Sequence, residues 1–234
     1  MEKKRWLALI LGLSLVLTGT AGAESLPGGG GEKYVALTFD DGPTAGVTER
    51  LLNGLQERFV QATFFLCGYR MGRCPELLQR MAEEGHELAI HGQTHRYLHD
   101  CPAQTVRQEL TETMEQIESL CGVRPRLFRP PGGLTGGAVK STAAELDLSI
   151  ILWSVDPVDW SCHDSQTVAN RIVSAVRDGD IILLHDLSDS SVEAAMMVID
   201  TLEARGYRFC TVSELAYLRG IVPETGAVYG RFAP

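Results

Sequence analysis

Two adjacent carboxylates, Asp40 and Asp41, stand at the end of an apolar run, in the motif Thr-Phe-Asp-Asp-Gly-Pro. Neighbouring carboxylates repel one another unless something separates their roles. A metal ion does this, because one acid can bind it while the other serves as a general base. Taken alone, the segment is equally compatible with an ordinary Asp-Gly turn.

Two histidines, His91 and His95, lie four residues apart in the segment HGQTH, directly after another apolar run. One turn of chain can aim both imidazoles at a common metal, and two imidazoles with one carboxylate leave positions open for water and substrate. A glutamate after the first histidine would suggest a zinc protease, but Gly92 occupies that place. The alternative is a solvated group of histidines, since His86 and His99 are nearby.

Charged residues at two further strand ends need partners. Arg129 precedes the rigid segment Pro-Pro-Gly-Gly, and Asp40 is the natural carboxylate for it. His185 closes an apolar run and could act as a general acid if Asp159 raises its pKa. Each residue also has a structural alternative. Arg129 could belong to a stiff loop, and His185 could be a core histidine. Trp160, which follows Asp159, could be a packing residue.

These residues must be positioned by the strands that precede them. Short runs of β-branched and aromatic residues predict strands at 34–39, 63–66, 87–90, 127–129, 149–153, 181–184 and 207–212. Helical spacing predicts helices at 48–58, 75–84, 102–120, 137–145, 167–176 and 190–204. This alternation predicts an α/β fold with a parallel sheet, and the lack of a glycine-rich nucleotide motif favours a barrel over an open sheet.

The amino-terminal segment has the layout of a secretory signal peptide, with basic residues before an apolar run and then Ala-Gly-Ala. The apolar run is shorter than the roughly 20 residues that a membrane-spanning helix needs, so no stable membrane insertion is expected after cleavage. Four consecutive glycines follow and indicate a flexible linker. The expected organisation is a signal peptide at 1–23, a linker at 24–32, one catalytic domain at 33–220 and a C-terminal tail at 221–234.

The composition is that of a globular protein, with 44% hydrophobic and 22% charged residues in 234. The net charge is −9 and no run of Lys or Arg occurs that could track a phosphate backbone, which argues against a nucleic-acid partner. All six cysteines follow the predicted signal peptide. In an exported chain they can form disulfides, but buried and reduced thiols are an open alternative.

The motifs TFDDG, HxxxH, RPPGG, DPVDW and LLH occur in an order that resembles the polysaccharide deacetylase family, which has the NodB homology domain and is also known as carbohydrate esterase family 4. The resemblance extends from about Lys33 to about Arg219. It implies a distorted (β/α) barrel of the NodB type. It also implies that Asp41, His91 and His95 bind a divalent metal, zinc in the first instance, with cobalt or another divalent ion as alternatives.

The resemblance implies proton-transfer roles for four other residues. Asp40 would be the base that activates the attacking water, and Arg129 would pair with it. His185, oriented by Asp159, would protonate the leaving sugar amine.

Three residues are implied in substrate binding by the same resemblance. The backbone N–H of Gly132 would stabilise the oxyanion, and Leu183 and Trp160 would line a small pocket for the acetyl methyl. Two positions depart from the family pattern. Gly92 replaces a Ser or Thr whose hydroxyl braces the ligand loop, and Gly132 replaces a Tyr whose ring forms a wall of the sugar site, so the substrate preference is expected to differ.

The resemblance therefore implies a secreted or cell-wall-associated enzyme that removes N-acetyl groups from an amino-sugar polymer, either peptidoglycan or a chitin-like chain. Two alternatives stay open, an O-acetyl esterase acting on xylan with the same site and a catalytically silent carbohydrate-binding relative. Retention of every expected metal and proton-transfer residue favours an enzyme. We expect a monomer whose partner is its polysaccharide substrate.

Overall fold

A computed structural model of the chain describes residues 32–233. The predicted signal peptide, and the predicted linker except for its last residue, lie outside the described residues. No helix within 32–233 is both long enough and apolar enough to cross a membrane.

The centre of the domain is an eight-stranded sheet in the order β6-β1-β2-β3-β4-β5-β8, with β7 also paired to β1. The strand pairs are parallel. The strands are β1 (Lys33–Asp40), β2 (Thr63–Leu66), β3 (Glu87–Ile90), β4 (Leu127–Phe128), β5 (Ser149–Ile151), β6 (Ile181–His185), β7 (Tyr207–Cys210) and β8 (Val228–Tyr229). Because all carboxyl ends of parallel strands meet at one edge, this topology gathers the residues that follow the strands.

The chain beyond β5 closes the sheet into a ring. Val155 forms a parallel bridge with Ile182 of β6. The Ser154 N–H donates to the Ile181 carbonyl at 3.0 Å, and the Leu183 N–H donates to the Val155 carbonyl at 2.9 Å. The first strand in the sheet order therefore meets the segment after the sixth, and the predicted distorted (β/α) barrel is confirmed.

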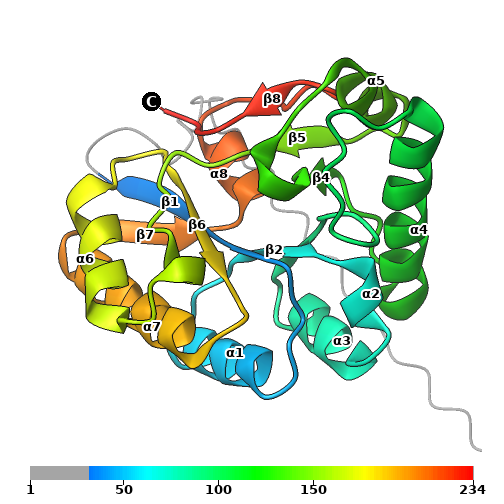
Figure 1. Cartoon of the computed structure of the whole chain (residues 1–234). Helices are drawn as coiled ribbons and strands as arrows, with labels where there is room; N and C mark the ends of the chain where they lie inside the picture. Colours follow the sequence, from blue (N-terminus) through cyan, green and yellow to red (C-terminus); the bar gives the residue numbers. More distant parts are fainter. Residues whose placement is uncertain (1–31, 234) are drawn as a thin grey trace, which may run out of the picture. The chain divides into compact units, whose positions relative to one another are not determined.

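Helices surround this ring (Figure 1). They pack in sequence around it, α6 against α7, α7 against α1, α1 against α3, α3 against α4 and α4 against α5. Their bounds are α1 (Val47–Glu57), α2 (Gly68–Met71), α3 (Pro75–Glu83), α4 (Ala103–Cys121), α5 (Gly137–Glu145), α6 (Ser165–Ala175), α7 (Asp189–Ala204) and α8 (Val212–Leu218), with 3-10 turns η1 (Pro131–Gly133) and η2 (Asp159–Ser161).

The two faces of the strands contact different apolar clusters, because side chains alternate along a strand. The larger cluster lies between the sheet and the surrounding helices. The smaller cluster contains Ala36, Phe65 and Ile151 together with Leu215 of α8 and Phe232. Thr38 and Asp40 follow Ala36 on the same face of β1, so the polar part of this face lies toward the carboxyl end of the strand.

The seven predicted strands and six predicted helices are present; β2, β3 and α5 have the predicted ends and the others are shifted. The predicted strand at 207–212 is too long, because Thr211 starts α8 with a capping box: its Oγ1 accepts from the Glu214 N–H at 3.2 Å, and the Glu214 carboxylate accepts from the Thr211 N–H at 2.8 Å. Helices α2 and α8 and strand β8 were not predicted. The segment set apart as a tail packs against the domain, since β8 pairs with β5 and Phe232 is buried. All six cysteines are free thiols, which agrees with the reduced alternative.

Candidate active site

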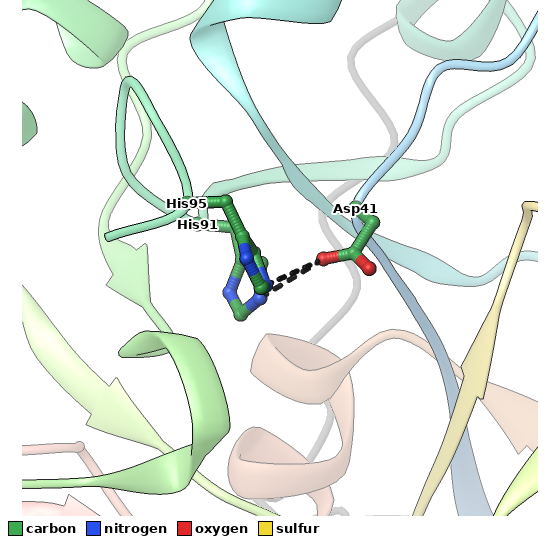
Figure 2. Close-up of side chains that lie close together, drawn as sticks. All are labelled: Asp41, His91 and His95. Atoms are coloured by element: carbon green, nitrogen blue, oxygen red, sulfur yellow. Dashed lines mark ion pairs between the residues drawn. The ribbon is translucent and has the colours of Figure 1, made fainter. Parts of the chain in front are cut away.

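Asp41, His91 and His95 come together at the carboxyl edge of the sheet. Asp41 follows β1, and His91 follows β3. The Asp41 Oδ1 atom lies 3.3 Å from His91 Nε2 and 3.1 Å from His95 Nε2. Figure 2 shows both imidazoles directed at the Asp41 carboxylate. One ligand atom from each residue lies within 4.8 Å of the other two, so Asp41, His91 and His95 form a compact set of donors, named the metal set below.

This donor set fits a divalent metal. The Asp41 Oδ1 atom is buried and has no hydrogen-bond partner of good geometry among residues 32–233. Burial raises the pKa of Asp41, but the neighbouring His91 and His95 outweigh it and hold the pKa well below its usual range. A carboxylate and two imidazoles that converge without satisfying one another match the ligands zinc prefers.

The hydrogen bond on the far side of His91 fixes its tautomer. Its Nδ1 atom lies 2.8 Å from the carbonyl oxygen of Arg129. A carbonyl only accepts, so Nδ1 carries the proton and the Nε2 lone pair faces Asp41. Such an outer hydrogen bond orients a metal-binding imidazole and increases its basicity.

The histidine loop is braced by an acid that was not predicted. Glu109 of α4 accepts the Thr94 N–H at 2.8 Å and the Thr94 hydroxyl at 2.5 Å. Gly92 has a φ of +90°, a conformation that a Ser or Thr adopts only with strain. The brace that the family pattern assigns to position 92 is therefore supplied here by Glu109. The signal was available in the sequence, because Glu109 lies beside Leu110 on the apolar face of the predicted helix.

Asp40 and Arg129 form a buried ion pair next to Asp41 and His91. The Arg129 Nη1 atom lies 2.6 Å from Asp40 Oδ1 and also donates to the Thr38 hydroxyl at 2.9 Å. Its Nε and Nη2 atoms donate to the carbonyls of Ile151 and Leu152. The guanidinium is fully buried, and every nitrogen has an acceptor, as a buried charge requires.

His185 and Asp159 form a second buried pair of ionisable side chains. The His185 Nδ1 atom lies 2.8 Å from Asp159 Oδ1, and the His185 backbone N–H donates to Asp159 Oδ2 at 2.9 Å. The Ser191 hydroxyl also donates to Oδ2, at 2.6 Å. Burial lowers the pKa of His185, but the hydrogen bond and charge of Asp159, helped by the charges of Asp40 and Asp41, outweigh it and raise the pKa to about 9.

Three of the five non-glycine residues with positive φ in residues 32–233 lie at the same edge. Asp41, His95 and Val158 have φ values of 78°, 59° and 58°, in the left-handed region that a β-branched residue such as valine strongly disfavours. Each lies in the metal set or directly before Asp159. Non-glycine residues held in this region commonly mark functional sites.

A cavity of about 420 Å³ joins these groups. Asp40, the three metal-set residues and His185 line it, while Arg129 and Asp159 are absent from its walls and support it from behind. The residues predicted to bind substrate, Gly132, Trp160 and Leu183, also line it. Tyr97, Trp153 and Asp156, which were not among the predicted site residues, complete the wall.

Asp186 is a further residue that sequence reasoning missed. It is fully buried and accepts the Thr48 hydroxyl at 2.5 Å, while the Thr48 Oγ1 accepts from the Thr44 N–H at 2.7 Å. Burial raises the pKa of Asp186 to about 6. These bonds tie the end of β6 to the loop that follows Asp41. An acid directly after His185 was the available signal.

Comparisons with known proteins agree with this geometry. Residues 28–151 match the family model described as polysaccharide deacetylase. A peptidoglycan-N-acetylglucosamine deacetylase of Bacillus cereus is 37% identical over 189 residues, which cover 79% of this chain and 88% of the relative. The chain belongs to the polysaccharide deacetylase family. The resemblance found in the sequence, and the expectation of an enzyme of this family, are thereby confirmed.

Two other proteins that the chain resembles differ in how much of their length the similarity covers. The peptidoglycan-N-acetylmuramic acid deacetylase PdaC of Bacillus subtilis is 36% identical over 184 residues, which cover 79% of this chain but 39% of PdaC. The chain thus spans well under half of PdaC. A solved family 4 acetyl xylan esterase from Clostridium thermocellum, in complex with a cobalt ion, has a TM-score of 0.80 and 32% identity, covering 85% of this chain and 98% of that one.

Proposed function

We propose that this chain is a metal-dependent hydrolase that removes N-acetyl groups from an amino-sugar polymer, peptidoglycan or a chitin-like chain. The observation that carries the proposal is the placement of Asp40 and His185 in one cavity with the set Asp41, His91 and His95. Relatives named as peptidoglycan deacetylases support the substrate class.

Asp41, His91 and His95 would hold the divalent metal. Zinc is the first choice for a carboxylate with two imidazoles, and the cobalt ion of the related esterase supports a divalent ion as a class. When bound, such an ion polarises the acetyl carbonyl and makes water more acidic. Two imidazoles and one carboxylate leave room in the coordination shell for these groups.

Asp40 is the base of this proposal. Arg129 holds one carboxylate oxygen, and the other lies 3.7 Å from His91 Nε2, on the side of the metal set. Asp40 takes a proton from the attacking water as the water oxygen bonds to the carbonyl carbon. The backbone N–H of Gly132, at the cavity wall, stabilises the negative oxygen that develops.

His185 is the acid. Asp159 holds its Nδ1 proton, and the raised pKa keeps the ring protonated near neutral pH. Its Nε2 donates a proton to the amide nitrogen as the C–N bond breaks, which yields acetate and a free sugar amine. Leu183 and Trp160 enclose the acetyl methyl in the same cavity.

The proposed location is outside the cytoplasm, secreted or associated with the cell wall. Relatives that act on peptidoglycan support it, as does the signal-peptide pattern at 1–23. We propose a monomer at that location, with the polysaccharide as its partner.

A second candidate, an O-acetyl xylan esterase, is favoured by the similarity to the solved acetyl xylan esterase. An alcohol leaves more readily than an amine and relies less on the acid His185. A silent carbohydrate-binding relative is the third, and the retained proton-transfer residues count against it.

The test is acetate release by the purified protein from N-acetylglucosamine oligomers, peptidoglycan and acetylxylan, with zinc or cobalt and with a chelator. Metal-dependent release from an amino-sugar polymer, lost in His91→Ala, is expected. Release from acetylxylan alone would favour the esterase. No release from any polymer, with metal bound to the wild type, would favour the silent relative.

A further inference from the structure

Tyr97 exposes its ring at the rim of the cavity that holds the metal set. The side chain is 59% exposed, yet it lines the same cavity as Asp41 and His185. No hydrogen bond of its hydroxyl is found among residues 32–233. A large aromatic ring left in water beside a site rich in polar groups suggests contact with a ligand.

The backbone of Tyr97 is anchored although its ring is exposed. The next residue, Leu98, is completely buried in the main core cluster. The Tyr97 carbonyl accepts a bond from the Cys101 thiol at 3.4 Å. The ring therefore projects from a fixed point, two residues after His95.

Gly132 provides the space that the Tyr97 ring occupies. A Cβ atom at position 132 would lie 2.9 Å from Tyr97 Cε1, well inside the 3.5–4.0 Å at which carbon atoms pack. Gly132 also has a φ of +68°, which disfavours any side chain. The aromatic ring that the family pattern places at position 132 is missing here, and a ring from the histidine loop fills the adjoining space.

Trp160 provides a second exposed ring in the same cavity. It is 64% exposed and follows Asp159, the partner of His185. The cavity thus has one exposed aromatic residue from the loop of the metal-binding histidines and one from the loop of the acid pair. Flat apolar rings complement the C–H faces of pyranose sugars, while the polar groups between them contact the acetamide.

We propose that Tyr97 is a sugar-stacking residue that determines substrate specificity, and that Gly132 is required for its position. This inference rests on the proposed function, because it assumes a polymer of amino sugars in the cavity. The ring of Tyr97 packs on a pyranose of the bound chain and contributes to its binding, while the proton transfers stay with Asp40 and His185.

The first test is binding without turnover. The Kd of an N-acetylglucosamine oligomer is measured by calorimetry for Asp40→Asn and for Asp40→Asn with Tyr97→Ala. We expect a Kd about tenfold higher for the double variant, the scale of one aromatic contact. Tyr97→Phe in the same background should restore the affinity, because stacking needs the ring and not the hydroxyl. Equal Kd values for the Ala and Tyr forms would overturn the inference.

The second test compares steady-state kinetic constants of variants that keep Asp40. Tyr97→Ala should raise KM for the oligomer about tenfold and change kcat much less. The rise should be much smaller for 4-nitrophenyl acetate, which has no sugar ring. Tyr217→Ala removes a more exposed tyrosine from α8, outside the cavity lining, and should leave KM for both substrates unchanged. Equal losses on both substrates would mean that Tyr97 supports the fold of the site and does not contact sugar.

The link to Gly132 is tested by a double-mutant cycle. Gly132→Ala should raise KM for the oligomer more in the wild type, where it also displaces the ring, than in Tyr97→Ala, where only the backbone strain at this φ remains. Additive effects would overturn the dependence of Tyr97 on Gly132. If the wild type released no acetate from any polymer while oligomer binding still depended on Tyr97, the proposed function would fail and the stacking residue would stand.

Discussion

Arg129 binds one carboxylate oxygen of Asp40, and the other oxygen faces His91. The Asp40 Oδ1 atom lies 2.6 Å from the buried guanidinium, while Oδ2 lies 3.7 Å from His91 Nε2, toward the metal set. One oxygen is thus fixed by the arginine and the other is left for chemistry. This difference between the two oxygens of Asp40 agrees with the different roles proposed for the neighbouring acids Asp40 and Asp41.

Asp40→Asn should keep metal binding and lose turnover. The amide oxygen of asparagine can still accept from Arg129, so the fold and the metal set should survive, but an amide cannot take a proton from water. We expect kcat to fall by a factor of roughly 10²–10⁴, measured by acetate release alongside the metal content of the protein. Asp41→Asn is the matched control and should lose metal. Full activity of Asp40→Asn would refute the base assignment.

Arg129→Met should destabilise the whole domain. It removes the partner of a buried carboxylate and leaves the carbonyls of Ile151 and Leu152 without a donor. The expected loss is about 3–5 kcal/mol in the free energy of unfolding, measured by urea denaturation. Arg50→Ala breaks an exposed pair with Asp189 and should cost at most about 1 kcal/mol. A loss for Arg129→Met as small as that of the control would contradict this account of the pair.

Asp159→Asn should move the alkaline limb of the pH–rate profile to lower pH. A general acid works only while protonated, so activity falls as pH rises through its pKa, which is raised to about 9 for His185. Removing the Asp159 charge removes the main group that raises this pKa, so the fall should begin at lower pH. The profile of kcat on an N-acetylglucosamine oligomer is the measurement, with the exposed Asp189→Asn as control. An unshifted limb would exclude His185 as the titrating acid.

His185→Ala gives a complementary check of the same role. It should slow amide hydrolysis far more than hydrolysis of an activated acetate ester, since only the amine leaving group requires a proton. Rates on an N-acetylglucosamine oligomer and on 4-nitrophenyl acetate are compared. Similar losses on the two substrates would count against the acid assignment.

Glu109→Gln should weaken metal binding without touching a ligand. Both carboxylate oxygens accept charge-assisted bonds from Thr94. A neutral glutamine amide can keep the bond from the Thr94 N–H but must reverse the bond to the hydroxyl, and it loses the charge that strengthens both. Affinity for zinc should fall by roughly 10–100-fold, measured by competition with a chelating dye, and saturating metal should restore much of kcat. Glu112→Gln, exposed on the same helix, should match the wild type. Unchanged affinity in Glu109→Gln would show that the brace is dispensable.

The sequence predicted the parts of the site that depend on strand ends. Asp41 and His91 follow strands whose β-branched and aromatic composition is plain, and a parallel sheet places all such ends at one edge. The barrel class and the gathering of the expected metal and proton-transfer residues follow from that rule. The roles of these residues stay predictions until the variants are measured.

The supporting contacts were not predictable in the same way. The place of Glu109 on the apolar face of its helix indicates burial but not its partner Thr94. The place of Tyr97 depends on how a loop packs, which residue spacing does not reveal. The short β8 pairs with β5 through two residues, too few to give a strand pattern. The start of α8 was misassigned because an apolar strand runs directly into a capping box without a turn residue between them.

The pairing of β1 with β6 determines when, during synthesis and folding of the chain, the site can form. Asp40 lies beside His185 in this ladder, although 145 positions of chain separate them. A contact of such long range forms late, since closing a large loop must precede it. A growing chain in which residue 185 has not yet emerged holds the proposed base without the proposed acid. On this proposal the enzyme acts only after essentially the whole domain has been synthesised, which would protect any polymer or precursor that it meets earlier.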